Sequence, residues 1–361
     1  MRQHQLYKSL TLKNLFYIFL LIVCFSSCKN NDVKLAETLA SGDTLDIKYA
    51  QGFSIIDYQD FKLLTVKSPW PDAEQDFTYA LVKEGQTVPD GIAYTHKINI
   101  PLKRVVLTST TFIPAMESLG KTETLVGFPS LDYISSTETR KRIDAGAVRE
   151  LGANESINTE ILLELQPDAV VGFAIDGQNK TFNTIEKNNI PVIYNGDWIE
   201  SSPLGKAEWL KFFGALYDEI NLAEEQFNTI EKDYLNTKEL ATSAQNIPLV
   251  LSGSMFKDVW YLPYGDSWQA QFIKDAYGRY VYDYTRGKGS ISLAFERVLD
   301  KAQNADVWIG PGSYTSYKSM LNESPHYGQF DAFKNKRVYG SGSVTGETGG
   351  MLFYELGPNR P

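Results

Sequence analysis

Cysteine and histidine are scarce in this sequence of 361 residues, which contains two cysteines and three histidines. Neither C-x-x-C nor H-E-x-x-H occurs, and dispersed histidines do not supply the clustered ligands that a bare transition metal needs. The G-x-S-x-G pattern of a hydrolase nucleophile is also missing. A hydrolase would have to be centred on His96 or His326, because His4 lies in a segment that we expect to be removed. We therefore expect no catalytic site, no metal site and no resident cofactor.

Long apolar runs are lacking as well. The longest, Leu15–Phe25, has about 11 residues and is too short to cross a bilayer. Basic residues precede it, as in the first part of a secretory signal. Small residues and Cys28 follow it, and this arrangement resembles the lipobox of bacterial lipoproteins, although Phe25 stands where leucine is usual. We predict a signal peptide over 1–27 and a lipid on Cys28.

A lipid on Cys28 predicts a periplasmic protein that is anchored to the membrane, with 28–44 as a polar tether. Simple secretion with cleavage nearby is the alternative. Residues 1–27 carry three positive and no negative side chains, so cleavage takes the formal net charge from −9 to −12. An acidic chain with dispersed basic residues is a poor candidate for binding nucleic acid. The mature chain keeps one cysteine and has no disulfide.

Hydrophobic patterning divides the rest of the chain. Residues 45–100 alternate at period two and predict a β-rich extension. After Pro101, continuous apolar runs of the buried parallel type alternate with helical patterns. We expect strands at 104–108, 125–128, 169–173, 191–194, 248–252, 306–310 and 336–339, and helices at 158–165, 179–188, 267–277 and 292–302. The pattern predicts two doubly wound α/β lobes, an N-terminal lobe over 101–201 and a C-terminal lobe over 247–361.

The segment between the lobes has the strongest helical pattern. Over 202–236, apolar residues recur at spacings of three and four with one gap near Ala223. Ser202 and Pro203 supply an N-cap and a first-turn proline. We predict a single helix about 45 Å long that links the lobes, with a cleft between them.

Polar and aromatic residues gather where the predicted strands end. Ligands of open α/β sheets bind beyond the carboxyl ends of the strands, and aromatic faces with hydroxyls suit a large, flat, partly apolar ligand. For each single aromatic residue, packing in the core is the alternative. The candidate ligand-binding residues are Thr110, Thr111, Ser130, Phe173, Trp198, Ser254, Met255, Trp260 and Tyr314.

Several segments resemble a known family. They are KRVVLTSTTFIPAMESLG, NTEILLELQPDAVVGF, PLGKAEWLKFFGALY, FERVLDKAQNADVWI and AFKNKRVYG. The chain from Pro101 onwards resembles periplasmic substrate-binding proteins of ABC importers, in the class whose lobes are joined by a single rigid helix and which serves ferric siderophores, haem and cobalamin. The resemblance implies a partner, an ABC permease dimer with its ATPase. It also implies that Glu160 and Glu296, one in each lobe, dock onto arginines of that permease.

Departures from the family pattern bear on the cargo and on the chain end. Cobalamin-binding relatives use tryptophan and arginine in a late loop where this chain has SGSVTGETGG, and Phe173 stands where they can show a tryptophan. A ferric siderophore is therefore the expected cargo, with cobalamin or haem as alternatives. An anchored sensor or surface lipoprotein on the same fold is the alternative from another class. Relatives continue into a helix beyond the position of Pro361, so we expect this sequence to be truncated there.

Overall fold

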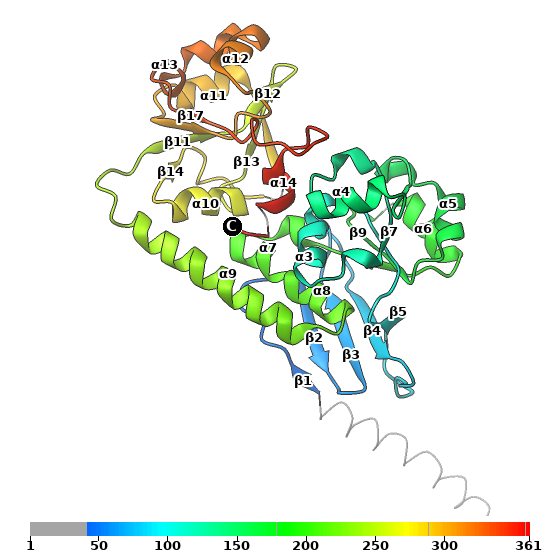
Figure 1. Ribbon diagram of the computed structural model, residues 1–361. Helices are drawn as coiled ribbons and strands as arrows, with labels where there is room; N and C mark the ends of the chain where they lie inside the picture. The colour runs from blue at the N-terminus through cyan, green and yellow to red at the C-terminus, as the bar shows by residue number, and fades with distance from the viewer. Residues whose placement is uncertain (1–41, 178, 288, 358) are drawn as a thin grey trace, which may run out of the picture.

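The computed structural model describes residues 42–177, 179–287, 289–357 and 359–361. The signal segment, Cys28 and most of the expected tether lie outside this part of the chain. Figure 1 shows two α/β lobes with helix α9 (Ile220–Ala241) running between them, and an N-terminal sheet below one lobe. The predicted two-lobed α/β fold is confirmed, with corrections in the linking segment and in the C-terminal lobe.

The β-rich extension is a five-stranded sheet in the order β1-β2-β3-β4-β5. Its last pair is parallel and the others are antiparallel. Asp43 and Thr44, expected at the end of the tether, form the first strand because they pair with Asp57 and Ile56. The strands are β1 (Asp43–Thr44), β2 (Phe53–Asp57), β3 (Phe61–Val66), β4 (Phe77–Lys83) and β5 (His96–Ile100).

The N-terminal lobe has a parallel sheet in the order β10-β9-β6-β7-β8. Its strands and helices alternate along the chain, as the continuous apolar runs predict. The strands are β6 (Val105–Leu107), β7 (Leu125–Phe128), β8 (Arg149–Glu150), β9 (Ala169–Gly172) and β10 (Val192–Tyr194). The helices are α3 (Ile113–Ser118), α4 (Thr137–Asp144), α5 (Thr159–Leu165) and α6 (Lys180–Lys187).

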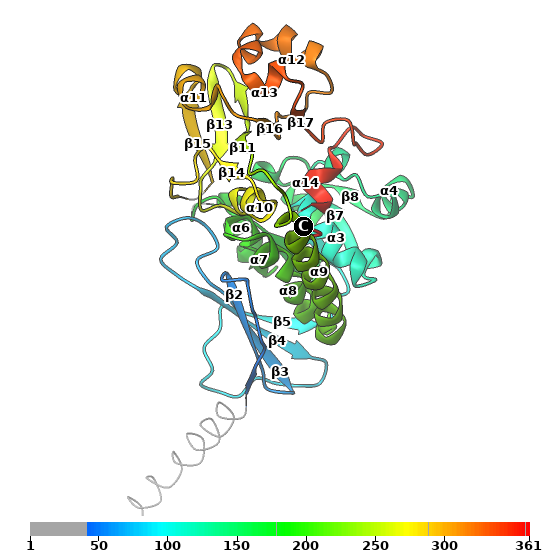
Figure 2. The same cartoon turned by 90° about the vertical axis from the view of Figure 1, so that its left-hand side faces the viewer.

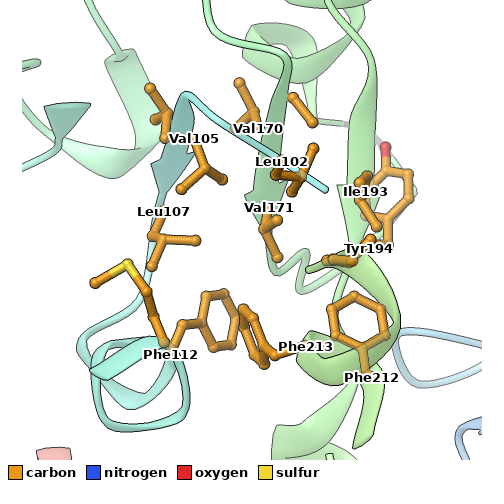
Figure 3. Close-up of a cluster of buried hydrophobic side chains, with 14 of the residues drawn as sticks. Leu102, Val105, Leu107, Phe112, Val170, Val171, Ile193, Tyr194, Phe212 and Phe213 are labelled. Atoms are coloured by element: carbon orange, nitrogen blue, oxygen red, sulfur yellow. The ribbon is translucent and has the colours of Figure 1, made fainter. Parts of the chain in front are cut away.

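The core of this lobe also includes the first residues of the linking segment. Strand residues such as Val105 and Val171 are fully buried, and Phe112 packs on Phe213 with 5.8 Å between ring centroids (Figure 3). Residues of the N-terminal sheet, among them Phe53 with its ring 4.8 Å from that of Trp209, join the same cluster. The extension is therefore packed onto the N-terminal lobe through one continuous core.

The linking segment is not the single helix that its pattern predicts. It forms α7 (Pro203–Glu208), α8 (Leu210–Leu216) and α9, with the start at Ser202 as predicted. The chain turns back after α8 at Asp218, whose φ is +57°. A Cβ on Gly214 would lie 2.6 Å from the Cβ of Ala223, so the glycine lets α8 and α9 approach closely. The apolar pattern continues through the turn because α8 and α9 both contribute buried residues to it. The interruption of the pattern near Ala223 falls where the two helices approach each other closely.

The C-terminal lobe holds a parallel sheet in the order β14-β11-β16-β17 and an antiparallel sheet in the order β12-β13-β15 that the sequence pattern did not predict. The helix expected from Ser292 begins at Phe295, because 290–294 pairs with β13 along its whole length. The strands are β11 (Leu249–Ser252), β12 (Ser254–Phe256), β13 (Val259–Pro263), β14 (Arg279–Tyr280), β15 (Ser290–Ala294), β16 (Val307–Ile309) and β17 (Val338–Tyr339). The helices are α10 (Trp268–Asp275), α11 (Phe295–Ala302), α12 (Tyr317–Glu323) and α13 (Asp331–Lys334).

After β17 the chain returns to the N-terminal lobe, where α14 (Leu352–Leu356) lies beside α3 (Figure 1). The buried Glu355 carboxylate accepts the backbone N–H groups of Ser135 and Ser136 at 2.6 and 2.9 Å. Asn359 donates its side-chain N–H to the carbonyl of Thr111 at 2.8 Å. The C-terminal segment is thus a second connection between the lobes. Among the helices of the described residues, none combines the length and apolar character that a membrane span requires.

Candidate functional site

A cavity of about 780 Å³, called here the cleft cavity, lies between the two lobes. Its walls come from the N-terminal lobe, α7, the C-terminal lobe, the loops of the N-terminal sheet and α14. A smaller cavity of about 370 Å³ lies among α3, α8, α9 and the last residues, and no residue of the C-terminal lobe's sheets lines it. The cleft cavity is therefore the candidate site. It is lined by Gln51, Gly52, Lys67, Ser68, Thr110, Thr111, Trp198, Ile199, Glu200, Ser201, Lys206, Asp266, Ser267, Trp268, Gln269, Gly287, Gly289, Ser290 and Tyr354.

Three of the predicted binding residues line the wall on the N-terminal lobe. Thr110 and Thr111 lie in a 3-10 turn directly after β6, where the hydroxyl of Ser109 accepts the backbone N–H of Thr111 at 3.3 Å. Trp198 lies in a 3-10 turn after β10. The strand-end rule brings these residues together because β6 and β10 flank β9 in one parallel sheet.

The facing wall uses residues that the sequence reasoning missed. Ser267 caps α10 by accepting the backbone N–H of Ala270 at 3.2 Å, and Trp268 opens that helix. The Lys206 ammonium lies 5.4 Å from the centroid of the Trp268 ring. A serine followed by tryptophan at a helix start was the available signal. It did not identify the wall, because only the tertiary structure brings α10 to α7.

Trp260, predicted to bind ligand, is instead a core residue. Its side chain has 0% exposure, and its indole N–H donates to the Ser252 carbonyl at 3.1 Å. Its ring packs on Trp308 and Phe330, with centroids 5.1 and 5.2 Å away. The prediction was wrong because Trp260 lies within β13, between β12 and β15, and points into the lobe.

The other five predicted residues lie elsewhere in the two lobes, and none of them lines the cleft cavity. The backbone N–H of Ser130 donates to Glu150 at 2.9 Å, and Phe173 packs against the core of the N-terminal lobe. Ser254 pairs with Tyr261 across β12 and β13. Met255 and Tyr314 pack against the core of the C-terminal lobe. Their contact with a ligand stays a prediction.

The floor of the cleft cavity contains buried charges that are already engaged. One oxygen of Glu200 accepts N–H groups of Gln51, Gly52 and Trp209 at 2.9–3.0 Å. Burial raises the pKa of the Glu200 carboxyl, and these donors offset part of that increase. The Lys206 ammonium donates to the Asp197 carbonyl at 3.0 Å and lies 3.7 Å from its carboxylate. Neither group is a free charge for a ligand.

A second buried carboxylate fixes the N-terminal sheet to the linking segment. Glu208, with 0% exposure, accepts the backbone N–H groups of Lys48, Tyr49 and Ala50 at 2.7–2.9 Å and pairs with Lys211 at 2.9 Å. Together with Glu200, it therefore binds the amides of five consecutive residues, 48–52. This clamp determines where the sheet loops enter the cleft cavity.

The two glutamates expected to dock onto a permease lie in corresponding places. Glu160 is in the first turn of α5 and Glu296 in the first turn of α11, one in each lobe, and both are exposed. A glutamate in a first turn also complements the helix dipole. Each lobe therefore presents one exposed carboxylate, as docking requires, and docking itself stays a prediction.

The two histidines in the described part of the chain contact other side chains. His96 pairs with Glu186 at 2.9 Å, and the ring of His326 packs on that of Phe295 at 4.9 Å. Across the ranges that the structure describes, no three His, Cys, Asp or Glu side chains form a group that could hold a metal ion.

A family model described as "Periplasmic binding protein" matches residues 105–345, which include both lobes and the linking segment. The chain belongs to the periplasmic binding protein family. An uncharacterised lipoprotein of Methanocaldococcus jannaschii is 26% identical over 251 residues, which make up 67% of this chain and 60% of that protein. The chain thus matches about three fifths of the length of this relative.

Solved structures share the fold of this periplasmic binding protein. A possible iron-binding (periplasmic solute-binding) protein from Staphylococcus epidermidis aligns with a TM-score of 0.56 and 17% identity, covering 72% of this chain and 94% of that one. A siderophore-binding protein from Vibrio cholerae, solved with Fe3+–Desferal, aligns with a TM-score of 0.53 and 15% identity, covering 72% and 97%. At these identities the likeness concerns the fold.

Proposed function

We propose that this periplasmic binding protein is the substrate-binding lipoprotein of an ABC importer, anchored through Cys28, and that it captures a ferric siderophore. The observation that carries the proposal is the cleft cavity, whose volume of about 780 Å³ falls within the range of small-molecule sites, ~300–1,000 Å³. Both lobes line it, so a ligand there would contact both at once. The solved relative that holds Fe3+–Desferal supports the choice of cargo class.

The side chains of the cavity suit a chelate more than a bare ion. Trp198 and Trp268 present aromatic surface from opposite lobes, and Thr110, Thr111 and Ser267 add hydroxyls. Aromatic faces with a few hydrogen-bonding groups bind a partly apolar organic shell. An iron ion would reach this site inside its siderophore, which supplies the ligands to the metal.

The mechanism that follows is capture and delivery without chemical turnover. The α9 helix is about 33 Å long and stiff, so the lobes close slightly around the cargo. The loaded protein then docks through Glu160 and Glu296 onto the permease dimer, whose ATPase drives import. Two separated carboxylates give an orientation-specific and salt-sensitive contact.

Titration of the protein with ferric siderophores, cyanocobalamin and haem tests the proposal, with tryptophan fluorescence and calorimetry as parallel readouts. We expect one ferric siderophore to bind with a submicromolar Kd, which corresponds to more than ~8 kcal/mol. The iron-free siderophore is the control for recognition of the complex. Binding of cobalamin or haem alone would show that this compound, and not a ferric siderophore, is the cargo. No response to any of them would favour an anchored sensor on this fold.

A further inference from the structure

The N-terminal sheet contributes its own wall to the cleft cavity. Gln51 and Gly52 precede β2, Lys67 and Ser68 follow β3, and all four line the cavity. These two strands are antiparallel neighbours, so the start of one and the end of the other lie at the same edge of the sheet. The backbone N–H of Lys67 donates to the Gly52 carbonyl at 2.7 Å and joins the two loops. In Figure 2, the blue connection above this sheet rises to the level of α10.

This wall is held rigidly in place. The clamp formed by Glu200 and Glu208 takes up every backbone N–H from Lys48 to Gly52. A Cβ on Gly52 would lie 2.7 Å from the Trp209 ring, so the loop rests directly on the linking segment. On the second loop, Asp76 accepts the backbone N–H of Ser68 at 3.2 Å. Groups presented by these loops are therefore positioned before a ligand arrives.

The charges around the cavity differ in how far they are already paired. Lys206 is paired with Asp197, and the Glu200 carboxylate is occupied by N–H donors. Asp266, on the facing wall, is exposed and accepts the backbone N–H of Gly287 at 3.1 Å. The Lys67 ammonium is exposed and has no ion pair or side-chain hydrogen bond within the described ranges. Among the described residues that line the cavity, Lys67 is thus the cation that a ligand can reach.

The geometry points to the N-terminal sheet as a third wall of the cargo site, with Lys67 selecting chelates that carry negative charge on their periphery. This inference rests on the proposed function. A positive charge held on a fixed loop discriminates between partners through complementary and like charges. The cargo it fits is an anionic ferric complex, such as one formed by catecholate or carboxylate groups.

The test compares two ferric complexes by calorimetry, the anionic complex of a tricatecholate siderophore and the cationic complex of desferrioxamine B. We expect wild type to favour the anionic complex. Lys67→Gln should weaken its binding about fivefold, because one partly exposed ion pair is lost, and should not weaken binding of the cationic complex, because a like charge is removed. Lys67→Arg, which keeps the charge, should stay within about twofold of wild type. The loss in Lys67→Gln should shrink as salt is added.

Lys97→Gln is the matched control, since it removes one exposed lysine from β5 of the same sheet at a position that does not line the cavity. A second variant, Gln51→Trp, tests the wall itself by adding bulk at the cavity edge, and should weaken both complexes at least tenfold. Unchanged binding of the anionic complex by Lys67→Gln, or equal losses with Lys97→Gln, would overturn the role of Lys67. Unchanged binding by Gln51→Trp would overturn the third wall.

The outcomes also separate this inference from the proposed function. If wild type binds a ferric complex and all variants match it, the inference fails and the proposed function stands. If wild type binds no ferric complex, both fail together.

Discussion

Tyr234 on α9 donates its hydroxyl hydrogen to Asp275 on α10 over 2.7 Å and so ties the linking helix to the C-terminal lobe. Lys238, one turn further along α9, pairs with the same carboxylate at 2.9 Å. One turn earlier, Glu231 accepts the Tyr49 hydroxyl at 2.7 Å and pairs with Lys48 at 3.1 Å. The helix is therefore bound by side chains to the N-terminal sheet and to the C-terminal lobe within about two turns. These contacts explain how α9 can act as a stiff connector.

Removing the hydroxyl in Tyr234→Phe should lower the free energy of unfolding by about 0.5–1.5 kcal/mol. The loss is moderate because Asp275 keeps its bonds to Lys238 and Gln271, so no charge is left unpaired. Urea denaturation measures it. Tyr58→Phe is a matched control, since Tyr58 stacks on Phe61 and its hydroxyl has no partner in the described part of the chain. Equal effects of the two variants would show that the contact with Asp275 contributes nothing.

The clamp on the N-terminal sheet should depend strongly on Glu208. Glu208→Ala leaves Lys211 as a buried charge with one remaining hydrogen-bond acceptor, the Asp46 carbonyl at 2.8 Å, and a contact with the Phe227 ring, whose centroid lies 4.9 Å from the ammonium. It also leaves three backbone N–H groups unpaired. We expect a loss of about 3–5 kcal/mol in the free energy of unfolding. Adding Lys211→Met to the same chain should recover part of the loss, because the uncompensated charge is removed. A double variant as unstable as the sum of the two single variants would contradict this coupling.

The buried Glu200 carboxyl predicts a specific pH dependence. Its pKa is raised in the folded state mainly by burial, so the folded protein binds this proton more tightly than the unfolded chain. The stability from protonation is fully present below the unfolded pKa, about 4.5, and is lost as pH rises through the folded pKa. Wild type should therefore gain stability relative to Glu200→Gln as pH falls towards that value. Urea titrations of both proteins at several pH values measure the difference, and a constant difference would contradict it.

The docking proposal predicts separate effects on binding and on import. Glu160→Ala combined with Glu296→Ala should leave cargo affinity within about twofold of wild type, because neither residue lines the cleft cavity, and should abolish uptake. Uptake of labelled chelate by cells that express the protein with its permease measures the second effect. Glu164→Ala with Asp300→Ala removes exposed carboxylates from the same two helices and serves as the control. Normal uptake by the double variant of Glu160 and Glu296 would contradict the proposal that these residues dock onto the permease.

Local sequence patterns predicted much of the fold but only part of the candidate site. Continuous apolar runs located the parallel strands of both lobes except the two-residue strands β8 and β14, and the strand-end rule placed Thr110, Thr111 and Trp198 in the cavity wall. The same rule failed for Trp260, because its segment is the central strand of an antiparallel sheet, and a buried aromatic and a ligand-facing one have the same local pattern. Trp268 was missed because it lies in the cavity wall only when α10 packs against α7, and the local sequence pattern does not show that contact.

The linking segment shows most clearly which properties are local. By itself, the sequence determined that residues 202–236 are mainly helical, that the helix starts at Ser202 and which residues form its buried stripe. Only the tertiary structure decided that the chain folds back at Asp218, because Gly214 and Ala223 allow two helices to pack closely and share one buried stripe. Helical periodicity records which face is buried, and it contains no information about whether the partner of that face is another domain or the next helix of the same chain.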